Sequence, residues 1–228
     1  MLEKKGHGEK CELNSARRLL LALESLHGKT ITADCLHPVP DTAQTIIEKG
    51  GHYCFQVKGN KNYLLAPIQK AFPSKPPAYG LPEKGHGRIE QRAVLVKPTN
   101  ALKSSFPHAR SIIAVYSKGI REGEPYENIR YYISSQTPES RSRNRWGELI
   151  RGHWGGVENR NHWSRDAIWL EDKTRSRNYN LVGNLAVLRN SLLVIVAEHR
   201  EQYGSLPAFT EALRANEPEA YRLITTPL

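Results

Sequence analysis

The stretch that decides the fold runs from Lys29 to Val57 and reads KTITADCLHPVPDTAQTIIEKGGHYCFQV. It begins with a short β-strand pattern that ends at Asp34. A helical pattern follows from Asp41, and Gly50-Gly51 is a typical helix-terminating pair. A second strand pattern then runs from His52 to Val57. A strand, a helix and a strand joined by short links predict a right-handed crossover between two parallel strands.

Two polar residues follow these strands directly. Asp34 comes after the first strand and Lys58 after the second. In parallel sheets, functional side chains gather at the carboxyl ends of the strands. This position distinguishes Asp34 from the other carboxylates of the chain as a candidate site residue. The alternative is that Asp34 only caps the turn in the DCLHP loop.

Outside this stretch the sequence predicts further helices and a second group of strands. Helices are expected at 14–26, 63–72, 138–150, 157–169, 180–199 and 206–214, strands at 88–96, 111–116 and 129–134, and a Pro-rich linker at 73–82. The three strands predict a small antiparallel sheet with a hairpin turn in EGEPYEN, residues 122–128. The apolar face of the helix at 180–199 is expected to be core; it consists of Leu181, Leu185, Leu188, Leu192 and Ile195.

Composition indicates a basic protein that binds a polyanion. The 228 residues are enough for one domain, or for one domain with an insertion, and carry a net charge of +10. Six arginines but only two acids lie between Arg141 and Arg165. A chain this basic is often made for nucleic acid, although the charge can also serve solubility alone.

Cysteine usage and hydropathy exclude several classes of protein. Cys11, Cys35 and Cys54 are far apart and form no CxxC pair, so neither a disulfide framework nor a zinc ribbon is expected. The N-terminus has no apolar signal core. The longest strongly apolar run, residues 192–197, is far too short to span a bilayer. We therefore expect a cytoplasmic protein with no membrane partner.

A second informative stretch runs from Arg151 to Asp166 and reads RGHWGGVENRNHWSRD. It holds one carboxylate, Glu158, among arginines, histidines and tryptophans, a mixture that suits phosphate chemistry better than core packing. Asp34 at a strand end and Glu158 on a later helix can converge to hold Mg²⁺, which prefers carboxylate oxygens. Nearby arginines would bind phosphates. Two Mg²⁺ ions would clamp the attacking and leaving oxygens of a phosphodiester.

The histidines of this stretch do not indicate a zinc site. His153 and His162 are nine residues apart, whereas the HExxH zinc motif places its histidines four apart on one helix face. We expect a structural or DNA-contacting role for both.

Four stretches together carry a resemblance to a known family: ITADCLH, GGHYCFQVKGN, HGRIEQR, and RGHWGGVENRNHWSRD with the trailing EDKTRSR. In order and spacing they resemble bacterial insertion-sequence transposases of the DDE type, within the H-repeat-associated family. The resemblance implies an α/β fold over residues 1–228 with a ribonuclease H-like core, a mixed sheet flanked by helices. It also implies a β-rich insertion at about 83–136, before the final catalytic helix.

The resemblance also implies roles for individual residues. Asp34 matches the second catalytic aspartate of the family and Glu158 its glutamate, and both would bind Mg²⁺ in a two-metal site, which Mn²⁺ can also fill. Trp154 stands where relatives have an arginine, so Arg151 or His153 takes that role. The residues expected to contact DNA are Arg151, His153, Arg160, His162, Arg165, Lys58 and Asn60.

The chain departs from the family pattern at its start. The first catalytic aspartate of the family lies on a strand upstream of Asp34, yet residues 1–12 contain no Asp. We therefore expect an N-terminally truncated transposase that would cleave and join double-stranded DNA at transposon ends, inactive alone and associating with itself or a full-length relative. One alternative is a non-catalytic DNA-binding remnant or regulator. Another is a stand-alone Mg²⁺ nuclease that uses Asp34, Glu158 and Asp166 or Asp172.

Overall fold

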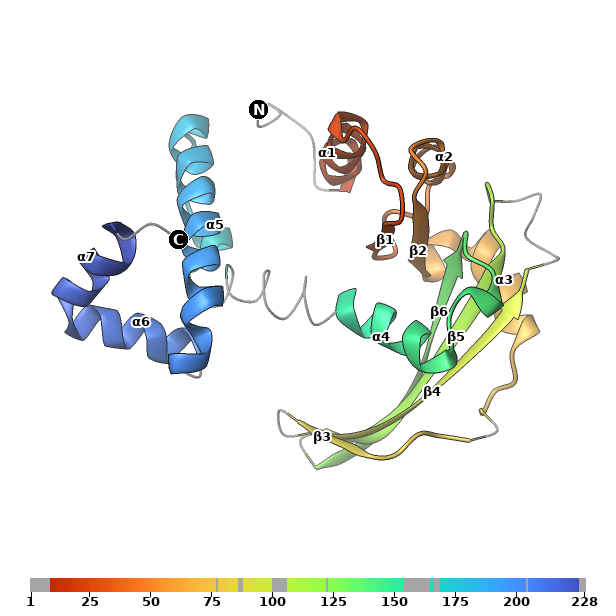
Figure 1. Cartoon of the computed structure of the whole chain (residues 1–228). Coiled ribbons are helices and arrows are strands. Elements are labelled where there is room, and N and C mark those ends of the chain that lie inside the picture. Colours follow the sequence, from red (N-terminus) through yellow and green to blue (C-terminus); the bar gives the residue numbers. More distant parts are fainter. Residues whose placement is uncertain are drawn as a thin grey trace. The chain divides into compact units, whose positions relative to one another are not determined.

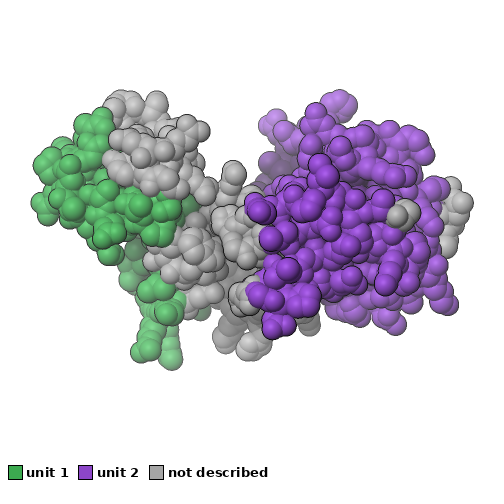
Figure 2. Space-filling model, turned by 90° about the horizontal axis from the view of Figure 1, so that it is seen from below, with its two compact units in different colours: residues 1–4, 154–228 green, residues 5–153 purple. Residues whose placement is uncertain are grey.

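The computed structural model describes residues 9–76, 78–85, 88–99, 106–121, 123–153, 165, 169–203 and 205–225. The chain divides into two compact units, which Figure 2 shows in different colours. One unit contains residues 5–153, and the other contains residues 154–228 together with residues 1–4.

The first unit is built on one six-stranded mixed sheet. Its strands are β1 (Thr30–Ala33), β2 (His52–Val57), β3 (Glu83–Gly85), β4 (Arg88–Pro98), β5 (Ser111–Arg121) and β6 (Glu124–Ser134). They lie in the order β1-β2-β6-β5-β4-β3. β1 and β2 are parallel, which confirms the predicted crossover, and the other neighbours are antiparallel. The helices are α1 (Glu9–Ala22), α2 (Pro40–Glu48), α3 (Asn62–Ala71) and α4 (Arg143–His153), with 3₁₀ turns at Gly59–Lys61 and Pro138–Ser140.

The crossover helix α2 ends as the sequence predicts. Gly50 adopts φ +77°, and its N–H donates to the Ile47 carbonyl at 2.9 Å. Gly51 permits a close approach, since a Cβ there would lie 2.7 Å from the Leu26 Cβ. The beginning differs from the prediction: α2 starts at Pro40, so Asp41 lies in its first turn instead of capping it.

The predicted antiparallel block is not a separate sheet. β6 pairs with β2 through Cys54↔Ser134 and the next three residue pairs, so both groups of strands form one sheet. The hairpin is also tighter than predicted, because β5 continues to Arg121 and β6 begins at Glu124. Gly123 has φ +88° at the turn. The long ladder between β5 and β6 satisfies the backbone groups of a segment whose composition favours a turn.

Helices cover both faces of this sheet (Figure 1). Side chains of alternating strand positions pack with α2 and α3 into the main core, which includes Ile46, Tyr53, Phe55, Leu64, Ile68, Ala114 and Ile133. α4 lies on the other, concave face, where Trp146 is fully buried and Val94 approaches Gly147. Thr30 and Thr32 of β1 belong to the second face, because side chains alternate along a strand and Ile31 and Ala33 pack against the main core.

The second unit is helical where it is described. It contains a 3₁₀ turn at Glu171–Lys173, α5 (Tyr179–Tyr203), α6 (Leu206–Ala215) and α7 (Glu217–Thr225). Leu206, Phe209 and Leu223 form a small core. The predicted core face of α5 is wrong for three of its five members: Leu181, Leu188 and Leu192 are exposed. α7 was not predicted, and the helix predicted at 157–169 falls almost wholly outside the described residues. Among the described helices, none has both the length and the apolarity needed to cross a bilayer.

Candidate functional site

Asp34 lies one residue beyond the end of β1, and its carboxylate takes part in the turn. Its Oδ1 accepts a hydrogen bond from the Leu36 N–H at 3.0 Å and lies 4.0 Å from Nε2 of His37. The Asp34 side chain is nevertheless 34% exposed. The capping role considered for Asp34 is therefore real, and it leaves the carboxylate accessible to a ligand.

The loop that holds Asp34 is tied to the end of the neighbouring strand. Nδ2 of Asn60 donates to the Cys35 carbonyl at 2.9 Å, and Lys58, two residues earlier, is exposed. The structure thus brings together two polypeptide segments that carry three predicted site residues. These are Asp34, Lys58 and Asn60.

The last turn of α4 contacts the strand that ends at Asp34. Nδ1 of His153 lies 3.1 Å from Oγ1 of Thr32. Further back along the chain, Nη2 of Arg141 donates to Oγ1 of Thr30 at 3.2 Å. Asp34 follows Thr32 by two residues, and alternate residues of an extended strand share one face of the sheet. A predicted DNA-contacting residue, His153, is therefore held two strand positions from the candidate catalytic carboxylate.

Gln56 is a buried polar residue beside the candidate site, and the sequence interpretation did not single it out. It lies on β2 and is 3% exposed, and its buried Oε1 has no hydrogen-bond partner among the described residues. β1 pairs with β2 up to Ala33↔Phe55, so one further step of the register would place Asp34 opposite Gln56. The sequence signal that could have identified Gln56 is its position as the single amide between apolar residues in HYCFQV. Its burial is notable because buried polar atoms without partners are uncommon.

Two arginines affect the ionisation of His52 on β2. Burial lowers the pKa of His52, and the nearby charges of Arg110 and Arg141 lower it further. Its imidazole Nδ1 lies 3.3 Å from Oγ of Ser135. Burial and these positive charges therefore favour the neutral form of His52.

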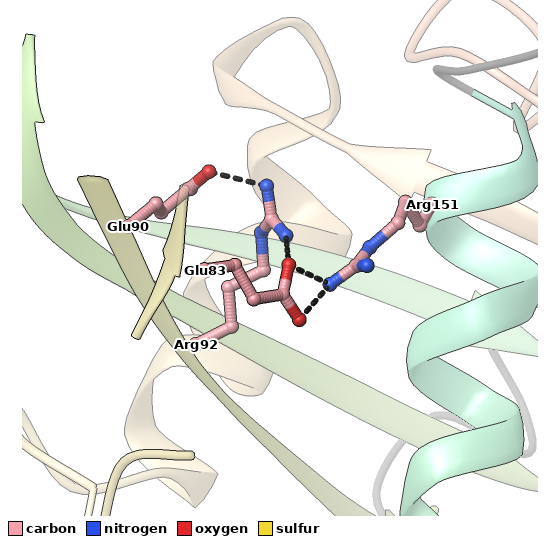
Figure 3. A network of polar contacts seen from close by, with 4 residues as sticks. All are labelled: Glu83, Glu90, Arg92 and Arg151. Carbon is pink, nitrogen blue, oxygen red and sulfur yellow. Dashed lines mark hydrogen bonds and ion pairs between the residues drawn. The ribbon is translucent and has the colours of Figure 1, made fainter. Parts of the chain in front are cut away.

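A four-residue ion-pair network lies at the end of α4 (Figure 3). Nη2 of Arg151 donates to both carboxylate oxygens of Glu83, each at 2.7 Å. Nη1 of Arg92 donates to the same carboxylate at 3.1 Å, and Nη2 of Arg92 donates to Glu90. The hydrogen bond from Arg151, together with the charges of Arg151 and Arg92, lowers the pKa of Glu83. Arg151 was predicted from the sequence, whereas Glu83 and Arg92 were missed.

The remaining predicted residues belong to the second unit. Glu158, Arg160, His162 and Asp166 lie outside the described residues. Arg165 is described, and its guanidinium binds the Glu171 carboxylate through Nε and through Nη2, the latter at 2.8 Å from Oε1. No cluster of three or more His, Cys, Asp or Glu side chains suited to a metal occurs within the part of the chain that is described.

Comparison with known proteins identifies the class of this protein. Residues 7–195 match the family described as the transposase DDE domain, which is most of the chain. The chain therefore belongs to the DDE-type transposase family, and the resemblance drawn from its motifs is confirmed.

The similar proteins include three from Escherichia coli strain K12. "Putative protein YbfL" is 32% identical over 200 residues, and "H repeat-associated putative transposase YhhI" is 31% identical over 200 residues. Each alignment covers 79% of this chain and 50% of the relative. "H repeat-associated putative transposase YbfD" is 36% identical over 83 residues, 34% of this chain and 33% of that protein. The chain thus spans about half the length of the first two relatives.

Proposed function

We propose that this chain supplies the second catalytic aspartate, Asp34, and the catalytic glutamate, Glu158, of a transposase that cleaves and joins DNA strands with Mg²⁺. The observation that carries the proposal is the contact between His153 and Thr32. From Thr32 two strand positions lead to Asp34, roughly 7 Å. The end of α4, which precedes Glu158 in the sequence, is therefore held close to the strand that leads into Asp34.

The donor set fits magnesium. Mg²⁺ keeps several waters and is usually held by one or two carboxylates, and Asp34 offers one accessible carboxylate at a strand end. Glu158 would be the second ligand. When bound, the metal ions would polarise the phosphodiester and stabilise the attacking and leaving oxygens. Mn²⁺ would fill the same site, since it also favours carboxylate ligands.

The chain's own residues would hold the DNA. We place the phosphate backbone of a double-stranded transposon end against Lys58, Asn60, Arg151 and His153 in the first unit. Arg160, His162 and Arg165 would serve the same purpose in the second unit. Together these side chains would bind phosphates in a largely sequence-independent way. We also propose that the chain associates with itself or with a longer relative.

The mixed sheet supports a ribonuclease H-like core as part of this proposal. β1 and β2 are the parallel pair that follows the expected order, with Asp34 after β1. Strands β3 to β6 occupy the position of the expected β-rich insertion at about 83–136. They also extend the sheet, because β6 pairs with β2.

Binding of Mn²⁺ to the purified chain, followed by electron paramagnetic resonance, tests the site. We expect Asp34→Asn and Glu158→Gln each to weaken Mn²⁺ binding by about tenfold or more, as loss of a charged ligand does. Asp41→Asn is the matched control, since Asp41 is an exposed aspartate on α2 that pairs only with a surface arginine in the described contacts. Equal Mn²⁺ affinity in the wild type and both site variants would contradict the shared site.

Strand cleavage gives the second readout. We expect no strand transfer by the chain alone on duplex DNA with Mg²⁺ or Mn²⁺. We expect activity that depends on Glu158 when a full-length relative supplies its first aspartate. Activity of the isolated chain that is abolished by Glu158→Gln would instead favour a stand-alone nuclease. DNA binding without Mn²⁺ binding would favour a non-catalytic DNA-binding protein.

A further inference from the structure

We propose that Arg92 and Arg151 form a cradle for one phosphate group of the DNA backbone, and that the Glu83 carboxylate occupies this cradle when DNA is absent. This inference rests on the proposed function, because it assumes that DNA is the polyanion this chain binds. It adds Arg92 to the DNA-contacting residues and assigns to Glu83 a competing role.

The geometry of the cradle is that of an anion site. Two guanidinium groups from different elements, Arg92 of β4 and Arg151 of α4, point at one carboxylate (Figure 3). Arg151 donates to both oxygens of Glu83 at 2.7 Å, and Arg92 donates to one of them at 3.1 Å. A phosphodiester offers two acceptor oxygens of similar spacing, and guanidinium groups bind carboxylates and phosphates in the same bidentate manner.

The pairing of β3 with β4 does not by itself favour a carboxylate at position 83. In the register of β3 and β4, Glu83 lies directly opposite Glu90. Like charges in this arrangement destabilise an antiparallel pair, and here Arg92 has to neutralise both carboxylates. A neutral residue at position 83 would suit the strand pairing better. The contact that Glu83 does serve is the one with the two arginines.

The carboxylate is in a position to exchange with solvent anions. The side chains of Glu83 and Arg151 are each 53% exposed, and that of Arg92 is 33% exposed. Exposed ion pairs shift equilibria by only about fivefold or less. A duplex presents a dense row of phosphates and releases counterions when cations bind them, so it can displace a single tethered carboxylate.

The position of the cradle connects it to the candidate catalytic site. Arg151 and His153 lie two residues apart in the last turn of α4. Arg151 contacts β3 through Glu83, whereas His153 contacts β1 through Thr32. One turn of helix therefore joins the cradle to the strand that ends at Asp34, and a DNA backbone bound in the cradle would pass close to that strand.

The test is a double-mutant cycle on affinity for a duplex of arbitrary sequence, measured by fluorescence anisotropy in EDTA at low salt. We expect Glu83→Gln to tighten binding by roughly two- to fivefold, the amount by which an exposed pair competes. The gain should shrink as salt is raised, because salt screens the competing pair. In the Arg151→Gln background, Glu83→Gln should give no gain, since one wall of the cradle is already missing.

Glu148→Gln and Arg145→Gln form the matched control cycle. Glu148 also pairs with one exposed arginine, Arg145, at 3.1 Å on α4, and its substitution changes the net charge by the same amount. We expect Glu148→Gln to change the affinity by less than about twofold. Circular dichroism and thermal unfolding of each variant verify that it is folded.

Three results would overturn the cradle. Weaker binding by Glu83→Gln would show that Glu83 positions Arg151 for DNA. A gain equal to that of Glu148→Gln, or one that persists with Arg151→Gln, would show that only long-range charge matters. EDTA removes metal, so the cycle does not depend on catalysis. If the double-mutant cycle gives the expected result but Mn²⁺ binding is unchanged in the Asp34 and Glu158 variants, the cradle is supported and only the proposed catalytic site is contradicted.

Discussion

At the scale of single residues, burial on β2 decides reactivity. Cys54 lies in the middle of this strand and is 2% exposed, and burial raises the pKa of its thiol to about 12. Burial likewise raises the pKa of the adjacent Tyr53, whose hydroxyl donates to the Pro107 carbonyl at 2.7 Å. Cys35, in the loop after Asp34, is only partly buried. The two thiols therefore have different environments within one crossover.

We predict that iodoacetamide at about pH 8 modifies Cys35 at least tenfold faster than Cys54, because only the thiolate reacts. Timed alkylation of a Cys11→Ser variant, read by peptide mass spectrometry, measures both rates. Concentrated guanidinium should abolish the difference, and a difference that survives unfolding would contradict the burial argument. The buried, neutral thiol of Cys54 contributes to the stability of the fold, and this contribution is complete below pH 9.0, the ordinary pKa of a thiol. The contribution is lost as the pH rises to about 12, the raised pKa of Cys54 in the folded chain.

At the scale of elements, the long antiparallel ladder of β4, β5 and β6 depends on close backbone approach. β4 and β5 are each 11 residues long and pair along their whole length. A Cβ at Gly119 of β5 would lie 2.1 Å from the Ile89 carbonyl oxygen of β4. Only glycine fits at position 119, so the close approach of β4 and β5 depends on this one residue.

We predict that Gly119→Ala destabilises the first unit by about 1–3 kcal/mol, the usual cost of overpacking. The change should appear as a lower urea midpoint in circular dichroism. Gly59→Ala is the control, since a Cβ at Gly59 meets nothing within 4 Å, and its effect should stay within about 0.5 kcal/mol. Equal midpoints for the two variants would mean that β4 and β5 separate at this point without cost.

At the scale of the whole molecule, the net charge of +10 is distributed unevenly along the chain. Arginines are concentrated between Arg141 and Arg165, on either side of the boundary between the two units. Within this stretch, Arg151 and Arg165 both form ion pairs with glutamates. The pair of Arg165 with Glu171 is the more buried of the two, so Arg165 would exchange its partner for a phosphate less readily.

We predict that DNA affinity falls steeply with salt, with a log–log slope of about 0.9 per phosphate neutralised. Replacing Arg151, Arg160 and Arg165 together by Gln should reduce the slope by roughly two to three units. A control variant with Lys173, Arg214 and Arg222 changed to Gln loses the same charge outside this stretch and should keep the slope. Anisotropy titrations at several salt concentrations measure it. An unchanged slope in the first variant would assign those arginines to structure.

The sequence by itself determined the parallel crossover, the place of Asp34 at its strand end, and the family. These depend on local periodicity and on motif spacing, which a chain displays before it folds. Only the tertiary structure decided that β6 joins β2, that Gln56 is buried on the face of α4, and that Arg151 meets Glu83. The residues of these contacts are far apart in sequence, and Arg151 meets Glu83 because the curved sheet brings its edge strands to one helix. No local pattern encodes that curvature.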